Sequence, residues 1–251
     1  MNDQFASDPR SRSRHRRSRR VIGASTYPRV SGAAVATFLV AAGLFWLAVP
    51  RAMVAFRELP ANHILQSVRA YDPVSIAVLN QLIQSRQAPA PGGGTARSRN
   101  ELASAYVEMA RAIGTTTPFG RSFLVDAREE EQASLAQSPG NGFGWARLAH
   151  LEMALAGPSE QVLRYLQLSF ETARFEPRLM VPRLLLAFAL RAYWGQEFTD
   201  LMLAQVRMAW SVAPEAVAQL SVKGRWTDFA RSALGGDADR LRDYDARVTR
   251  L

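Results

Sequence analysis

VSGAAVATFLVAAGLFWLAV, residues 30–49, contains no charged side chain, and the nearest charges on either side belong to Arg29 and Arg51. Its twenty residues would form a helix of about 30 Å at 1.5 Å per residue, close to the thickness of the hydrocarbon core of a bilayer. We therefore expect one transmembrane helix here, ended by Pro50, which cannot donate a backbone hydrogen bond. A short tail, residues 1–29, precedes this segment, and the larger part of the chain, residues 50–251, follows it.

The N-terminal tail, residues 1–29, carries eight arginines against Asp3 and Asp8. Like charges repel and little of the tail is apolar, so we expect it to be disordered. Seven of the arginines lie between Arg10 and Arg20, directly before the apolar run. By the positive-inside rule we expect the N-terminus in the cytoplasm and the larger C-terminal part on the other side of the membrane, which is the periplasm if the anchor lies in a bacterial inner membrane.

The same tail accounts for most of the net charge of +9 on the chain. We expect Arg10–Arg20 to contact anionic lipid headgroups, with nucleic acid as the less favoured alternative for this cluster, and we expect no nucleic-acid binding by the main domain. The segment Ser18-Arg19-Arg20-Val21-Ile22 resembles the start of a twin-arginine signal, so both Sec and twin-arginine export stay open. No small-x-small cleavage site precedes Pro50, so the predicted anchor remains attached.

The residues after the anchor have the pattern of soluble helices. We expect membrane-proximal helices and a Pro/Gly-rich loop in 50–99, followed by a helical domain in 100–251, because apolar residues recur at helical spacing and no run alternates with period two. The predicted fold is all-α: one transmembrane helix plus helical hairpins. The predicted helices are 62–71, 74–84, 100–113, 119–137, 142–156, 159–175, 182–194, 198–212, 214–222, 226–234 and 237–248.

Prolines end helices at a nearly regular spacing. Pro139, Pro177 and Pro214 are separated by 38 and 37 residues, just above the 34-residue tetratricopeptide period. After the first of them come Asn141, Trp145, Leu148 and Ala149, followed in the next predicted helix by Tyr165 and Leu168. At these residues the chain resembles tetratricopeptide-repeat proteins over about residues 100–214. The resemblance implies a solenoid of helical hairpins, and an irregular helical bundle is the alternative.

The motif S-P-x-N-x-x-x-W-x-x-L-A, Ser138 to Ala149, together with the basic tail and the anchor, more loosely resembles membrane-anchored accessory proteins of bacterial exopolysaccharide assembly. That resemblance implies a helper of polymerisation or export. We therefore expect a periplasmic scaffold or adaptor that binds other envelope components. The alternatives are a subunit of a secretion, pilus or cytochrome-maturation assembly or, less favoured, an envelope hydrolase or transferase.

Little in the sequence points to catalysis, so we expect no enzyme, no catalytic residues, no cofactor and no metal site. Cysteine is absent, which excludes disulfides and thiolate ligands. His63 and His150 are far apart and have no ligand spacing. We interpret Glu129, Glu130 and Glu131 as a solvated helix face, because consecutive helical side chains point about 100° apart.

The tetratricopeptide resemblance also implies a concave binding surface. An aromatic ring, a histidine and an arginine on such a surface suit a peptide or a partner helix. Four of the implied partner-binding residues lie on the helix predicted for 142–156 and two near the end of the helix predicted for 182–194. They are Phe143, Ala146, His150, Met153, Arg191 and Trp194.

Overall fold

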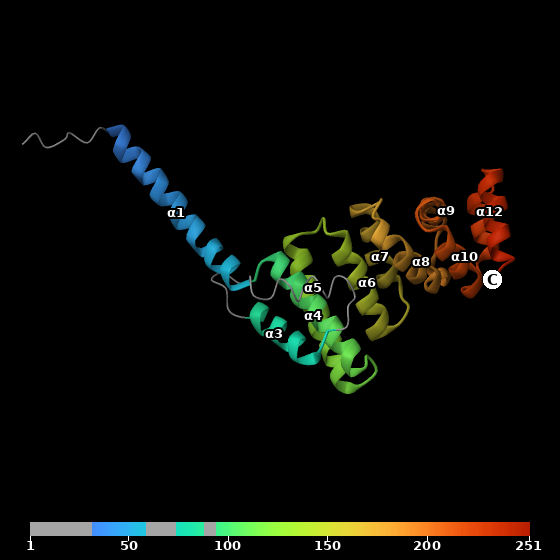
Figure 1. Cartoon of the computed structure of the whole chain (residues 1–251), viewed down its shortest axis with the longest axis horizontal. Coiled ribbons are helices and arrows are strands. Elements are labelled where there is room, and N and C mark those ends of the chain that lie inside the picture. Colours follow the sequence, from blue (N-terminus) through green and yellow to red (C-terminus); the bar gives the residue numbers. More distant parts are fainter. Residues whose placement is uncertain (1–31, 59–73, 88–93) are drawn as a thin grey trace, which may run out of the picture. The chain divides into compact units, whose positions relative to one another are not determined.

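The computed structural model describes residues 32–58, 74–87 and 94–251 (Figure 1). The chain divides into two compact units, Met1–Ala48 and Val49–Leu251. The described residues form eleven α-helices and one 3₁₀ turn, without any strand, and this confirms the all-α prediction. The predicted tail at 1–29 and the predicted helix at 62–71 lie outside the described residues.

Helix α1 extends from Gly32 to Glu58 and has 27 residues. The prediction that Pro50 ends this helix was wrong, because the helix continues through that position to Glu58. One proline removes a single hydrogen bond and crowds the preceding turn, at a cost of about 3 kcal/mol, and the residues on both sides still form their own bonds. Among the described residues, no helix combines the length and the apolar character needed to cross a membrane.

The large apolar side chains of α1 are exposed. Seven of them have at least 60% of their surface accessible: Phe38, Leu39, Val40, Leu44, Phe45, Trp46 and Leu47. Because consecutive helical residues point about 100° apart, runs such as Phe38-Leu39-Val40 place apolar groups on all sides of the helix. This differs from an ordinary surface helix, which buries one apolar stripe against a core.

The second unit starts with helices that pack side by side in antiparallel pairs. Helix α4 pairs with α5, since Ser134 Oγ donates to Ala96 O over 2.7 Å and the rings of Tyr106 and Phe123 stack at 5.9 Å. Helix α6 pairs with α7 in the same way. The bounds are Ile76–Gln87 for α3, Ala96–Ile113 for α4, Pro118–Gln137 for α5, Gly142–Ala156 for α6 and Glu160–Thr172 for α7.

The remaining helices form the C-terminal half of this unit. Helix α9 packs against α8, α10 and α11, and α12 covers α10 and α11. One hydrophobic core is shared by α3, α4, α5 and Leu151 of α6, and a larger one extends from Ala149 of α6 to α12. The bounds are Pro177–Ala189 for α8, Arg191–Tyr193 for the 3₁₀ turn η2, Gln196–Val212 for α9, Pro214–Lys223 for α10, Thr227–Leu234 for α11 and Ala238–Val248 for α12.

Two predicted helix starts were wrong by four residues or more. Helix α4 begins at Ala96 rather than residue 100, because Thr95 caps it by accepting a 3.1 Å hydrogen bond from the Ser98 amide. Helix α8 begins at Pro177, so Pro182 lies inside the helix and not in its first turn. Proline fits the first position of a helix well, and Pro177 occupies that position here. The arrangement of the hairpins as tetratricopeptide repeats stays a prediction.

Candidate functional site

The face of α6 predicted to bind a partner is partly accessible. Phe143 is 40% exposed and His150 is exposed, with its Nδ1 2.9 Å from Ala146 O. Met153 is half-buried and packs against the larger core. Ala146 is 3% exposed, because it faces the interior. Of this predicted set on α6, Phe143 and His150 are therefore the residues most accessible to a partner.

The two predicted residues after α8 lie in different surroundings. Arg191 is exposed on η2, and this turn is joined to the α6–α7 connection because Tyr193 OH donates to Pro158 O over 2.9 Å. Trp194 is half-buried, and its Nε1 donates to Ala187 O over 3.0 Å. Trp194 thus packs inward, whereas Arg191 is available on the surface beside the end of α6.

Trp194 belongs to an aromatic cluster contributed by four neighbouring segments. Its ring lies 5.1 Å from Phe188 on α8 and 5.5 Å from both Phe198 on α9 and Phe229 on α11. The closest pair is Phe188 and Trp226, whose rings are parallel within 5° and 4.0 Å apart between centroids. We call these five residues, Phe188, Trp194, Phe198, Trp226 and Phe229, the aromatic cluster.

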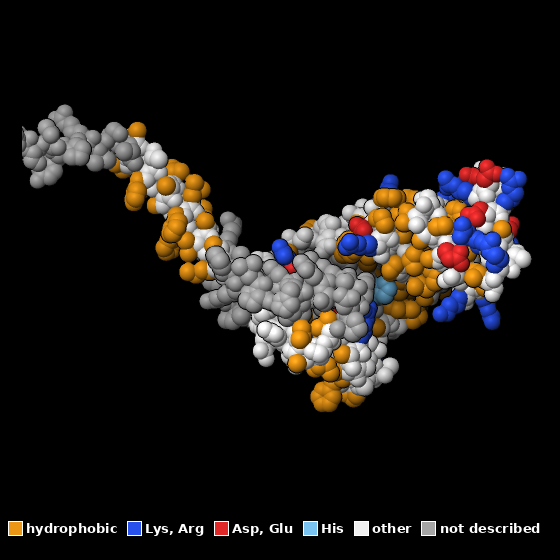
Figure 2. Space-filling model, in the orientation of Figure 1, with side chains coloured by type: hydrophobic (Ala, Val, Ile, Leu, Met, Phe, Trp, Pro, Cys, Tyr) orange, Lys and Arg blue, Asp and Glu red, His pale blue; other side chains and the backbone are white. Residues whose placement is uncertain are grey.

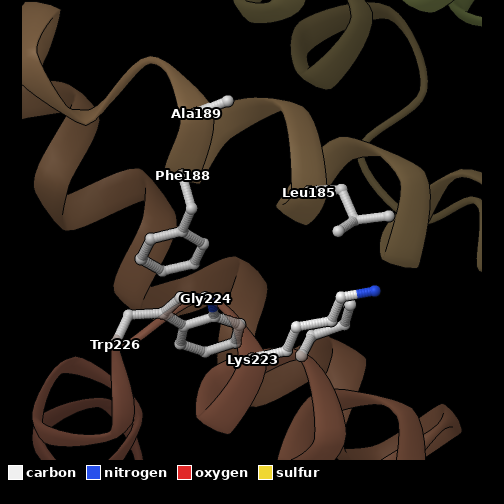
Figure 3. A pocket seen from close by; sticks show the side chains of 7 residues that line it. Leu185, Phe188, Ala189, Lys223, Gly224 and Trp226 are labelled. Carbon is white, nitrogen blue, oxygen red and sulfur yellow. The ribbon is translucent and has the colours of Figure 1, made fainter.

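A pocket opens beside the aromatic cluster, between α8 and the end of α10 (Figure 3). Its volume is about 280 Å³. Phe188 and Trp226 form one side, and Leu185 and the long side chain of Lys223 form the opposite side. The ammonium group of Lys223 is the only charged group in the lining, which consists of Leu185, Phe188, Ala189, Leu220, Lys223, Gly224 and Trp226.

The backbone beside the pocket is strained at Arg225, whose φ is +55°. Helix α10 ends there in a Schellman motif: the Trp226 amide donates to Ser221 O over 2.9 Å and the Arg225 amide to Val222 O over 3.2 Å. Glycine normally takes the left-handed position of this motif, and arginine occupies it here. Gly224 lies one residue earlier, where a Cβ would come within 2.6 Å of the Trp226 ring.

The prediction that Glu129, Glu130 and Glu131 form a solvated face was wrong for Glu131, which is 0% exposed. Its carboxylate accepts hydrogen bonds from Asn100 Nδ2, over 2.9 Å, and from Arg147. Helix α6 packs over this position, because a Cβ on Gly144 would lie 2.6 Å from Glu131 Oε1. Sequence spacing within α5 gave no sign that another helix would cover one of the three carboxylates.

Arg183 is a second fully buried charge, and its partners are hydrogen-bond acceptors at the end of α7. It donates to Ser169 O, to Ser169 Oγ over 3.0 Å and to Ala173 O over 2.8 Å. Burial lowers the pKa of Arg183 to about 10, and the Glu176 carboxylate partly opposes this shift. Because the last carbonyls of a helix lack partners within it, Arg183 caps α7 and joins it to α8.

We found no group of three or more His, Cys, Asp or Glu side chains suited to a metal ion among the described residues. Comparison of the chain with protein-family models, curated proteins and solved structures gave no match. The pocket was not predicted from the sequence. The only available signal was Lys223, the single lysine of the chain, three residues before Trp226.

Proposed function

We propose that this protein is a membrane-anchored adaptor whose helical unit binds other components of the bacterial cell envelope. The observation that carries the proposal is α1, whose large apolar side chains are exposed on all sides. Exposing such an apolar surface to water is unfavourable in free energy, whereas the acyl chains of a bilayer can cover it. The backbone groups of a helix are hydrogen-bonded within the helix, so they need no water in the bilayer. The arginines of 1–29 then orient the anchor with the N-terminus in the cytoplasm.

The length of the proposed anchor is taken from the uncharged run in the sequence, residues 30–49. The uncharged run begins at Val30, and residues 30–31 and the side chain of Ala34 lie outside the described set. The side chains of this run are described without a gap only from Val35 to Val49. A helix of that length would be about 22 Å long at 1.5 Å per residue, which is shorter than a bilayer core. The full run from Val30 to Val49 reaches about 30 Å, so the proposal uses all of it.

The anchor and its orientation are tested by cysteine accessibility, which is clean here because the chain has no cysteine. Ser11→Cys and Ser211→Cys place one thiol in the tail and one on an exposed position of α9. In spheroplasts, a membrane-impermeant maleimide should label position 211 and should label position 11 only after lysis. Alkaline washing should leave both proteins in the membrane fraction. Release by alkali, or labelling of position 211 only after lysis, contradicts the proposal.

The adaptor role is supported by two accessible residues seven positions apart on one face of α6, Phe143 and His150, and by Arg191 on η2, the turn that is joined to the α6–α7 connection. A photo-crosslinking amino acid placed at 143 or 150 should give the same specific product in cells, and the Arg191→Gln variant should weaken it. Phe119, which is 74% exposed on α5, is the matched control position. Equal products from position 119 would show that this face has no special role in partner binding.

The pathway served by this adaptor follows from the looser resemblance, so exopolysaccharide synthesis or export is the proposed setting. Deleting the protein should then reduce exported polysaccharide and leave intracellular precursors intact. Crosslinked partners that belong to a secretion, pilus or cytochrome-maturation assembly, combined with normal polysaccharide export, would favour that alternative. The crosslinking test reports on binding and the deletion reports on pathway, so the two claims fail independently.

A further inference from the structure

We propose that the pocket between α8 and α10 binds a bulky apolar side chain of an acidic peptide segment, with the Lys223 ammonium pairing with a carboxylate of that segment. This site is separate from the α6 face described above and extends the proposed function by naming the chemistry of a partner. It does not depend on the membrane anchor or on the pathway. Four observations support it: pocket size, lining, local charge and backbone strain.

The size and the lining of the pocket fit a single apolar side chain. At about 280 Å³ the pocket lies just below the usual 300–1,000 Å³ range of small-molecule sites, so it suits a single side chain better than a cofactor or a lipid acyl chain. The stacked rings of Phe188 and Trp226 form a flat apolar side. The aliphatic stem of Lys223 adds apolar surface and carries the ammonium group towards Leu185 (Figure 3).

The positive charge of the segments around the pocket favours an acidic partner. Residues 177–195 and 216–227, which contain all the lining residues, have four basic residues besides the buried Arg183 and no Asp or Glu. Acidic residues lie at the borders of these segments: Glu176, Glu215 and Asp228. Among the described residues, neither Lys223 nor Arg225 has an ion-pair partner, whereas Arg231 and Arg247 each pair with two carboxylates. In Figure 2 charges of both signs gather over α12. A carboxylate beside the pocket would therefore meet cations that lack a counter-charge.

The strain at Arg225 supports a binding role for this corner. A residue other than glycine in the left-handed region costs of order 1 kcal/mol, and such strain concentrates at ligand-binding positions. The turn holds Lys223 and Trp226 on the same pocket, and the Trp226 ring is fixed by the Phe188 ring and by the close approach of Gly224. The pocket is thus formed before a partner arrives, which lowers the ordering cost of binding.

Lys223 also provides a specific probe, because it is the only lysine. Reductive ¹³C-methylation keeps the positive charge and gives a lysine NMR signal that the Lys223→Gln variant identifies by its loss. The full chain, in phosphatidylcholine nanodiscs, is titrated with the peptide Ac-Gly-Asp-Phe-Glu-Gly-NH₂. The matched peptides replace Asp and Glu by Asn and Gln, or Phe by Ala. The acidic Phe peptide should shift the signal saturably, and both matched peptides should bind at least about tenfold more weakly.

The variants separate the charge from the apolar contact. Fluorescence anisotropy with a labelled peptide should show five- to tenfold weaker binding for both Lys223→Gln and Leu185→Ser. Val222→Ser changes an exposed neighbour that does not line the pocket, and Arg174→Gln removes a positive charge elsewhere, so both should bind like the wild type. Leu185 is 53% exposed, so its replacement should leave the fold intact, as circular dichroism would verify.

Three outcomes would overturn this proposal. They are equal binding of the neutral peptide, unchanged binding by both pocket variants, and displacement of the peptide by phosphatidylglycerol vesicles with a saturable shift of the Lys223 signal. The last outcome would assign the pocket to an anionic lipid. A failure of the crosslinking test on α6 would leave these results unaffected, so the two proposals are distinguishable.

Discussion

Different interactions hold the helices together in the region formed by α3–α6 and in the region formed by α8–α11. In α3–α6 the interior contains ion pairs: Arg86 Nε donates to Glu101 over 2.9 Å, and Arg147 pairs with Glu131. In α8–α11, a fully described part of the chain, the interior contains the aromatic cluster instead of ion pairs, with Phe188 stacked on Trp226. The second region also contains the pocket, a strained turn and two cations without ion-pair partners among the described residues.

The difference shows how two kinds of packing leave different surfaces for binding. A buried carboxylate needs its donors at fixed distances, so it dictates where the neighbouring helices lie. Flat aromatic rings pack in several geometries, and stacked, tilted and edge-to-face pairs all occur in the aromatic cluster. In the aromatic region a pocket opens at the surface beside the rings, whereas in the α3–α6 region buried carboxylates join the helices through hydrogen bonds. Four substitutions test this comparison.

The largest effect should come from Glu131→Ala. It removes the carboxylate that Asn100 Nδ2 and Arg147 share and leaves Arg147 only the Asn100 carbonyl as an acceptor, so the free energy of unfolding should fall by about 3 kcal/mol. Chemical denaturation of the full chain in nanodiscs, followed by tryptophan fluorescence, measures the change. Glu129→Ala is the control, because Glu129 is exposed and should change stability by less than about 0.5 kcal/mol. Equal effects of the two variants would refute the buried ion pair.

Gly144→Ala should have the second-largest effect. The added Cβ would lie 2.6 Å from Glu131 Oε1 and 2.9 Å from Leu135 Cδ2, so α6 must move away from α5. We expect a loss of about 1–3 kcal/mol in the same denaturation assay. The control is Gly140→Ala, because nothing lies within 4 Å of a Cβ at Gly140. If both variants unfold at the same denaturant concentration, α6 does not approach α5 as closely as described.

In the aromatic region, Gln205→Met should stabilise the protein. Gln205 is 1% exposed, and within the described part of the chain its Nε2 and Oε1 have no hydrogen-bond partner. Removing an unsatisfied buried amide should raise the free energy of unfolding by about 1–2 kcal/mol. Gln219→Met, at an exposed position on α10, serves as the control. A destabilised Gln205→Met protein would show that this amide is satisfied, for instance by a buried water molecule.

The smallest effect should come from Arg225→Gly. Glycine adopts a φ of +55° without a steric penalty, and its greater freedom in the unfolded chain offsets part of the gain. We expect a net stabilisation of about 0.5–1 kcal/mol, with peptide binding at the pocket weakened. Arg250→Gly, at an exposed C-terminal position, controls for the lost charge. A destabilised variant would mean that the Arg225 side chain makes a contact worth more than the backbone strain.

Helical periodicity and capping residues were enough to predict most of the described helices. Helix α6 has the predicted bounds Gly142–Ala156, and Asn141 caps it through a 3.2 Å bond from the Gly144 amide. Boundaries failed at two prolines: α1 passes through position 50, which was predicted to end it, and α8 contains Pro182, which was predicted to lie in its first turn. A proline removes one hydrogen bond, and the local sequence does not show whether packing offsets that loss.

The candidate sites were harder to predict because they depend on which helices meet. Trp194 was assigned to a binding surface with Arg191, yet its ring packs against Phe188, Phe198 and Phe229 from three helices. Lys223 and Leu185 are 38 residues apart, and nothing in either segment alone indicates a shared pocket. The binding roles of Phe143, His150 and Arg191 stay predictions.

The sequence by itself determined the all-α class, the uncharged run at 30–49 and the basic tail before it, because these depend on composition and on periods of a few residues. Only the tertiary structure decided that Glu131 is buried, that Arg183 caps α7, and that Lys223 lies on an apolar pocket beside Phe188 and Trp226. Burial and ion pairing arise between helices distant in the chain. Their free energies depend on distances that no local pattern encodes.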